Sequence, residues 1–306
     1  MLKQEAPWLA HVPQAMRQPL ADYLEGGVPV SVGLMHVLMA AESTHQARTA
    51  LTQTHPLLQD EAAARRLAEL IQLWDETPQA CELVKRVLAC VRHDDTGRSE
   101  SNRLSAWAAA FDQTAAISAE AGVALYSLGR GDLLDRATDE VVAAMRKWNL
   151  LNGGIALDLG CGIGRIIERI APEMDRVVGV DISGGMLATA RLRCGRFTNI
   201  ALLQSSGRDL ALFRDASFDL VYAVDTFPYL VLSGGDIAER HMRDIARVLR
   251  PRGTLLVLNY SYSGNRERDR REVAAVAGAA SLQVVRDGTR DFTTWDAVTF
   301  QMVRAP

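Results

Sequence analysis

Cysteine is scarce in this sequence, and neither sign of charge prevails. The 306 residues include four cysteines, whose positions show neither the close spacing of a metal site nor the framework of a small disulfide-bonded domain. We therefore expect no bound metal. The 34 basic and 37 acidic residues give a net charge of -3, which offers no general attraction for nucleic acid. We expect no nucleic-acid partner.

Long apolar runs are also missing. No apolar stretch approaches the roughly 18 residues that a membrane span needs. The amino-terminal residues lack a basic segment followed by an apolar one. Apolar residues nevertheless make up 48% of the chain, enough to bury a sizeable core. These features predict a cytoplasmic protein with no membrane partner.

The clearest motif that is present lies at residues 156–165. A short apolar run contains Asp158 and is followed by Gly160, Gly162 and Gly164, which predicts a strand that turns sharply into a helix. The glycines let a ligand lie against bare backbone, and the free amides of a new helix favour an anionic group. The carboxylate of Asp158 suits an ammonium group. The turn should therefore hold a ligand that carries both charges.

The pattern D-x-G-x-G-x-G resembles the first motif of class I S-adenosylmethionine-dependent methyltransferases. A dinucleotide fingerprint would have glycine or alanine where this chain has Arg165. The resemblance extends over residues 150–306, about half of the chain. It implies S-adenosylmethionine as the cofactor and an α/β fold, with a seven-stranded Rossmann-like sheet.

Later segments follow the same order of elements. A second β-branched run ends at Asp181, which lies 21 residues beyond Gly160, where α/β nucleoside sites place a carboxylate on the ribose hydroxyls. Further strands are expected at residues 201–204, 218–224, 254–258, 282–288 and 297–303, with a helix that starts near residue 184. The last two strands have no room for a helix between them, so we expect the final strand to be antiparallel.

The resemblance also implies the cofactor contacts. The residues that match the family's pattern are Asp158, Gly160, Cys161, Gly162, Asp181, Ile182, Met186, Ser206, Gly207, Arg208 and Ala223. Cys161 should offer a small side chain and a backbone amide. Ser206 stands where many relatives have an aspartate for the adenine amino group. Its hydroxyl, the backbone of Gly207 and Arg208, or Asp209 could meet the adenine edge instead.

Two residues are candidates for the chemistry itself. Tyr229 ends the segment 225–229, which in similar enzymes faces the methyl group and the substrate, although a core role for this ring is equally compatible with the pattern. The segment departs from the Asn-Pro-Pro-Tyr motif of enzymes that methylate nucleic-acid bases, which argues against such an acceptor. His241 could act as a general base, but a polar helix face explains it as well.

The amino-terminal half has the periodicity of helices and no strand pattern. Leu67, Leu70 and Trp74, for example, recur at helical spacing. The polar stretch at residues 92–103 looks like a linker. We therefore predict a helical domain at 1–100 and a methyltransferase domain at 101–306 that includes cap helices. The first domain could be a lid, an interface of a homodimer or a docking surface.

These features together predict an enzyme that transfers a methyl group from S-adenosylmethionine to an oxygen, nitrogen or carbon nucleophile of a small molecule. Few catalytic side chains are needed, because the sulfonium is already a good leaving group and the enzyme mainly aligns the nucleophile and excludes water. Two alternatives stay open. One is a protein or RNA methyltransferase, and the other is a non-catalytic scaffold or regulatory subunit that binds the cofactor.

Overall fold

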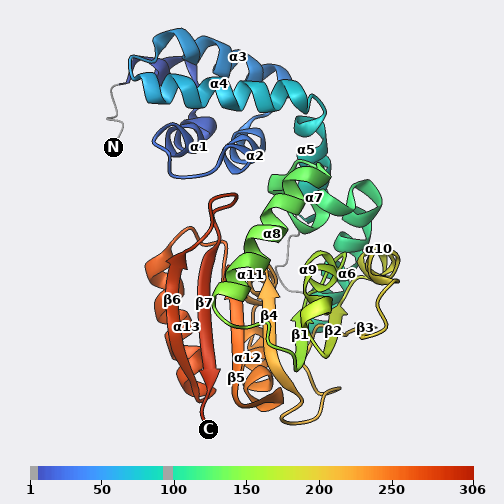
Figure 1. Ribbon diagram of the computed structural model, residues 1–306. Helices are drawn as coiled ribbons and strands as arrows, with labels where there is room; N and C mark the ends of the chain where they lie inside the picture. Colours follow the sequence, from blue (N-terminus) through green and yellow to red (C-terminus); the bar gives the residue numbers. More distant parts are fainter. Residues whose placement is uncertain (1–5, 92–98) are drawn as a thin grey trace. The chain divides into compact units, whose positions relative to one another are not determined.

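The computed structural model describes residues 6–91 and 99–306 (Figure 1). The described residues form two compact units. The helical unit comprises 6–91, 117–137 and 293–296, and the α/β unit comprises 99–116, 138–292 and 297–306. The predicted boundary at residue 100 differs from this division, because two later segments belong to the helical unit. Of the predicted linker, residues 92–98 lie outside the described residues, and α6 already begins at Glu100.

The α/β unit is built on one sheet of seven strands, as the sequence predicts. In chain order they are β1 (Ile155–Leu159), β2 (Arg176–Asp181), β3 (Ile200–Gln204), β4 (Phe218–Val224), β5 (Leu249–Leu258), β6 (Leu282–Arg290) and β7 (Val298–Arg304). They are arranged as β3-β2-β1-β4-β5-β7-β6. Strands β1 to β5 pair in parallel, whereas β7 is antiparallel to β5 and to β6. The carboxyl ends of the parallel strands therefore share one edge, where ligands bind in such sheets.

Helices cover this sheet and supply its core. They are α6 (Glu100–Ile117), α8 (Gly131–Lys147, of which 138–147 lie in this unit), α9 (Arg165–Ile170), η4 (Ala171–Glu173), α10 (Gly184–Cys194), α11 (Phe227–Leu232), α12 (Ile237–Val248) and α13 (Arg266–Ala279). Helix α10 packs against β2 and β3, α12 against β5 and α13 against β6 (Figure 1). Leu157, Val221 and Leu255 on the central strands are fully buried. The parallel strands are rich in apolar and β-branched residues because both faces of the sheet are covered.

The helical unit has a separate apolar core. Its elements are η1 (Pro7–His11), α1 (Gln14–Leu24), α2 (Val30–Ala40), α3 (Thr44–Thr54), η2 (His55–Leu57), α4 (Glu61–Glu76), α5 (Ala80–Val91), α7 (Ala119–Val123) and η3 (Leu125–Ser127), followed by the start of α8. The predicted stripe of Leu67, Leu70 and Trp74 on α4 is buried in this core. Within the same unit, the Trp295 ring lies 5.4 Å from that of Tyr126, centroid to centroid.

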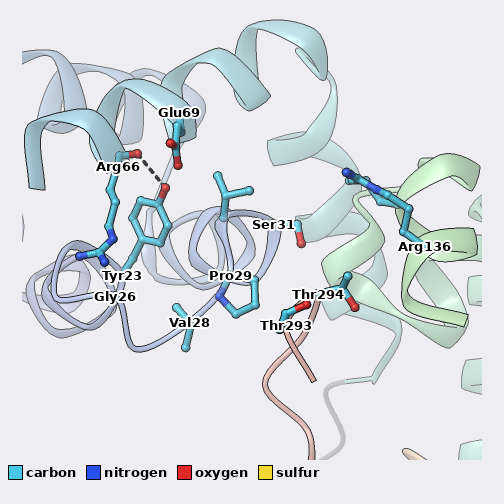
Figure 2. A pocket seen from close by; sticks show the side chains of 12 residues that line it. Tyr23, Gly26, Val28, Pro29, Ser31, Arg66, Glu69, Arg136, Thr293 and Thr294 are labelled. Atoms are coloured by element: carbon cyan, nitrogen blue, oxygen red, sulfur yellow. Dashed lines mark hydrogen bonds between the residues drawn. The ribbon is translucent and has the colours of Figure 1, made fainter. Parts of the chain in front are cut away.

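A pocket of about 330 Å³ opens in the helical unit (Figure 2). The Tyr23 hydroxyl on its wall donates a hydrogen bond to the Arg66 carbonyl oxygen at 2.7 Å, and the Arg66 guanidinium donates to the Leu24 carbonyl oxygen at 2.8 Å. These groups connect α1 to α4, so they serve the packing of the helices. No helix in the described part of the chain combines the length and the apolar character that a bilayer crossing requires.

Candidate functional site

The glycine turn connects β1 to α9 and has a backbone that favours glycine. Gly160, Gly162 and Gly164 have φ angles of 75°, 51° and 72°, all in the left-handed region. A Cβ atom at Gly160 would collide with the side chain of Thr226. The Thr226 hydroxyl donates to the Leu159 carbonyl oxygen at 2.7 Å. The turn is therefore closed against the segment that follows β4.

Several amides of this turn are used within the protein. Those of Gly160 and Cys161 donate to the Val180 carbonyl oxygen at 2.8 and 2.9 Å, and that of Gly162 donates to Asp181 Oδ2 at 2.7 Å. The Cys161 amide, which is predicted to meet the ligand, is therefore bonded to Val180 in this structure, and its contact with a ligand stays a prediction. The glycines supply backbone shape and close approach, while the amides of Gly160, Cys161 and Gly162 are bonded within the protein.

Asp158 lies at the centre of the site, on β1 between two neighbouring strands. Its register partners are Gly179 on β2 and Tyr222 on β4, and only 3% of its surface is exposed. Burial raises the pKa of the Asp158 carboxyl to about 8, although the Tyr222 hydroxyl and the charge of Arg165 both act to lower it. Because an unpaired charge is costly in such surroundings, a cation placed here would restore the ionised form.

Asp181 ends β2 and shapes the turn as well as the site. Its Oδ2 accepts from the Gly162 amide, and its Oδ1 accepts from the Ser183 amide at 2.8 Å. Burial raises the pKa of Asp181, while these amides lower it. Each carboxylate oxygen has a second acceptor position. The same carboxylate can therefore hold the turn and still accept a hydrogen bond from a hydroxyl group.

Helix α6 fixes the loop after β2 through Asp112, a contact that the sequence did not reveal. Asp112 Oδ1 accepts from the Ser183 hydroxyl at 2.6 Å and from the Gly185 amide at 2.8 Å. The Ser183 hydroxyl in turn caps α10 by accepting from the Met186 amide at 3.0 Å. Met186 itself is buried. Asp112 belongs to a distant helix with no motif around it, so no local pattern distinguishes it.

The loop after β3 lies beside Ile182. A Cβ atom at Gly207, where φ is 72°, would approach Ile182 Cδ1 to 2.8 Å. The Ser206 hydroxyl accepts from the Arg208 amide at 3.3 Å, and the Arg208 guanidinium donates to the Ser101 hydroxyl at 2.9 Å. Ile182 and residues 206–208 thus share one end of the site.

Two predicted residues are in the core instead. Ala223 on β4 has no exposed surface and packs in the main apolar cluster of the sheet, so its predicted contact with the cofactor stays a prediction. His241 is 1% exposed, and its Nδ1 lies 2.9 Å from the Ile237 carbonyl oxygen one turn earlier on α12. Burial lowers the pKa of His241. A general base must reach its substrate, so the burial of His241 argues against that role, which stays a prediction.

Tyr229 is half-buried on α11 and is surrounded by aromatic rings. Its ring centroid lies 5.0 Å from that of Trp107, 4.9 Å from that of Phe111 and 5.9 Å from that of Tyr262, all in edge-on arrangements. Burial raises the pKa of Tyr229 to about 12, so its hydroxyl stays protonated at neutral pH. Trp107 and Phe111 come from α6. The fold thus brings two aromatic residues of a distant helix to Tyr229.

A carboxylate adjoins these rings at the ends of β4 and β5. Asp225 and Asn259 have φ angles of 57° and 63°, a region that non-glycine residues adopt at a cost. Asn259 Nδ2 donates to Asp225 Oδ1 at 2.7 Å, and the Tyr262 hydroxyl donates to the same oxygen at 3.2 Å. Asp225 is thereby held in one orientation next to the aromatic cluster.

Comparison with known proteins covers the segment that contains most of this site. Residues 157–257 match the family model described as "Methyltransferase domain". The demethylmenaquinone methyltransferase of Tropheryma whipplei is 37% identical over 120 residues, which are 39% of this chain and 47% of that protein. The ubiquinone/menaquinone biosynthesis C-methyltransferase UbiE of Syntrophotalea carbinolica is 32% identical over 130 residues, 40% of this chain and 51% of that protein. This chain spans about half the length of the curated relatives that it matches.

A solved structure agrees with the fold. Phosphoethanolamine N-methyltransferase 1 of Haemonchus contortus, in complex with phosphoethanolamine and S-adenosylhomocysteine, superposes with a TM-score of 0.53 at 16% identity. The match covers 70% of this chain and 52% of that one. At this identity the likeness is one of fold.

The raised pKa of Asp158 predicts how stability depends on pH. The ordinary value is 3.8 and the folded value about 8, so between them unfolding releases a proton and rising pH favours the unfolded chain. Relative to Asp158→Asn, the wild type should lose unfolding free energy from pH 4 to pH 8, by at most about 1.4 kcal/mol per pH unit. Urea unfolding across this range measures the difference. Parallel profiles for the two proteins would contradict the raised pKa.

Proposed function

We propose that this chain, in which residues 157–257 form a class I S-adenosylmethionine-dependent methyltransferase domain, transfers a methyl group to a small molecule. The observation that carries the proposal is the pair of buried carboxylates, Asp158 and Asp181, on either side of the glycine turn. Both lie within the matched residues. The activity of the whole protein and its acceptor are part of this proposal.

The residues present fit S-adenosylmethionine, which has an amino-acid tail, a sulfonium and an adenosine. Asp158 would take the ammonium group of the tail, because its buried carboxyl lacks only a cation to ionise. Asp181 would accept the ribose hydroxyls at its remaining acceptor positions. Ile182 and residues 206–208 would border the adenine, and the buried Met186 on α10 is a further predicted contact. When bound, the cofactor supplies an electrophilic methyl group.

The aromatic cluster around Tyr229 supports a small acceptor with a flat or apolar ring. An aromatic ring of the acceptor could pack against these side chains in the edge-to-face or offset-stacked arrangements that aromatic pairs prefer. The names of the two relatives, a demethylmenaquinone methyltransferase and a C-methyltransferase of ubiquinone/menaquinone biosynthesis, are consistent with this class. Asp225 would take a proton from an acceptor hydroxyl, a role better suited to its position than to that of His241.

The remaining predictions about partners are also part of the proposal. We expect no nucleic acid among the acceptors, and a homodimer and a cytoplasmic location stay predictions. A protein or RNA methyltransferase would transfer the methyl group to a macromolecule, and a non-catalytic scaffold would transfer none. Both outcomes can be distinguished from transfer to a small molecule by direct measurement.

The proposal predicts methyl transfer to small molecules. Purified protein should bind S-adenosylhomocysteine in calorimetry and should transfer labelled methyl from S-adenosylmethionine to an organic extract that contains quinols and phenols. Label in the protein or RNA fraction would instead support the macromolecular alternative. Binding without any transfer would support the scaffold. Asp158→Asn, which removes the proposed ammonium partner, is the control and should bind poorly.

A second prediction concerns Tyr229. Tyr229→Phe keeps the ring and removes the hydroxyl, so turnover should fall about three- to tenfold, the effect of one hydrogen bond of about 1 kcal/mol. Affinity for S-adenosylhomocysteine should stay the same. Tyr23→Phe removes a hydroxyl in the helical unit and should change neither quantity. If Tyr229→Phe weakened cofactor binding as much as turnover, Tyr229 would be a structural residue.

A further inference from the structure

Arg165 is a buried cation with few partners. It is the first residue of α9 and directly follows Gly164, yet only 5% of its surface is exposed. Its Nη1 donates to the Thr138 hydroxyl at 2.9 Å. Among residues 6–91 and 99–306, no carboxylate oxygen lies within 4.0 Å of its guanidinium. A guanidinium has five donors, and burying its charge without an anion is costly.

A neighbour on the same helix shows the usual arrangement. Arg169, one turn later, donates to Asp139 at 2.9 Å and to Glu168 at 3.2 Å. Its side chain is 30% exposed. Arg169 therefore has both water and carboxylates to balance its charge. Arg165 is far less exposed to water and has no carboxylate partner among the described residues. It nevertheless occupies a position of the turn where dinucleotide-binding proteins have a small residue.

Arg165 lies next to the candidate cofactor site, because it directly follows Gly164 of the glycine turn. Its charge is one of the groups that lower the pKa of Asp158, so the two side chains interact electrostatically without forming an ion pair. The amides of Gly160, Cys161 and Gly162 are already bonded within the protein. These three amides are therefore not available to a carboxylate in this site, whereas the Arg165 guanidinium has further donors and is held by Thr138.

We propose that Arg165 binds the carboxylate of the amino-acid tail of S-adenosylmethionine, while Asp158 binds the ammonium group of the same tail. This inference rests on the proposed function, because it assigns a further contact in that site. Arg165 and Asp158 would then bind the two opposite charges of one α-amino acid group. Each buried charge would gain the partner that it lacks in the protein alone, and Thr138 would act as a positioning residue.

The test compares S-adenosylhomocysteine with its decarboxylated analogue, which keeps the amine and lacks the carboxylate. In calorimetry, the wild type should prefer S-adenosylhomocysteine by about 10- to 100-fold, the range for hydrogen bonds to a charged group. Arg165→Met should abolish this preference by weakening S-adenosylhomocysteine alone. Arg165→Lys should keep part of it, and Arg169→Met, the matched control on the same helix, should keep all of it.

The outcomes separate this inference from the proposed function. Equal affinity of the wild type for both compounds would overturn the role of Arg165 and leave cofactor binding intact, and this comparison needs no variant to fold. An equal loss for both compounds in Arg165→Met would show a structural role and would also overturn the inference. Binding of neither compound by the wild type would contradict the proposed function itself, and the inference with it.

Discussion

The site depends on a carboxyl group that is buried without a cation of its own. Asp158 lies in the middle of the sheet, and burial holds its pKa near 8. An aspartate in this position costs stability at neutral pH compared with an apolar residue. Such a cost is typical of a residue kept for binding, because a ligand cation converts the unfavourable group into a specific contact. The glycine turn gives the ligand access to it.

Helix α6 links the two halves of the candidate site. Asp112 on this helix holds the loop after β2, and Trp107 and Phe111, which precede it by five residues and one residue, pack against Tyr229 after β4. The helix is anchored near its start, where Glu100 pairs with Arg240 of α12 at 3.0 Å. A single element outside the sheet therefore contributes to the proposed cofactor side and to the proposed acceptor side.

The sequence predicts the parts of the site that depend on local backbone. The strands, the turn at Gly160 and the acidic residue at the end of β2 follow from apolar runs and glycine spacing, and the structure has them where expected. Contacts between distant segments were not predictable. Asp112 looks like an ordinary surface residue until the fold brings it to Ser183 and Gly185. Arg165 and His241 give no local sign that the fold buries them. The Cys161 amide could not be assigned either, because its acceptor, Val180, lies on another strand.

The most direct measurement is the proton balance of cofactor binding. Titration calorimetry with S-adenosylhomocysteine near pH 7, in two buffers with different ionisation enthalpies, gives the number of protons released. If an ammonium group binds to Asp158, its pKa must fall from about 8, and about one proton should leave on binding. Binding by the wild type without release of a proton would contradict the central claim that the buried carboxyl of Asp158 receives the charged tail of the cofactor.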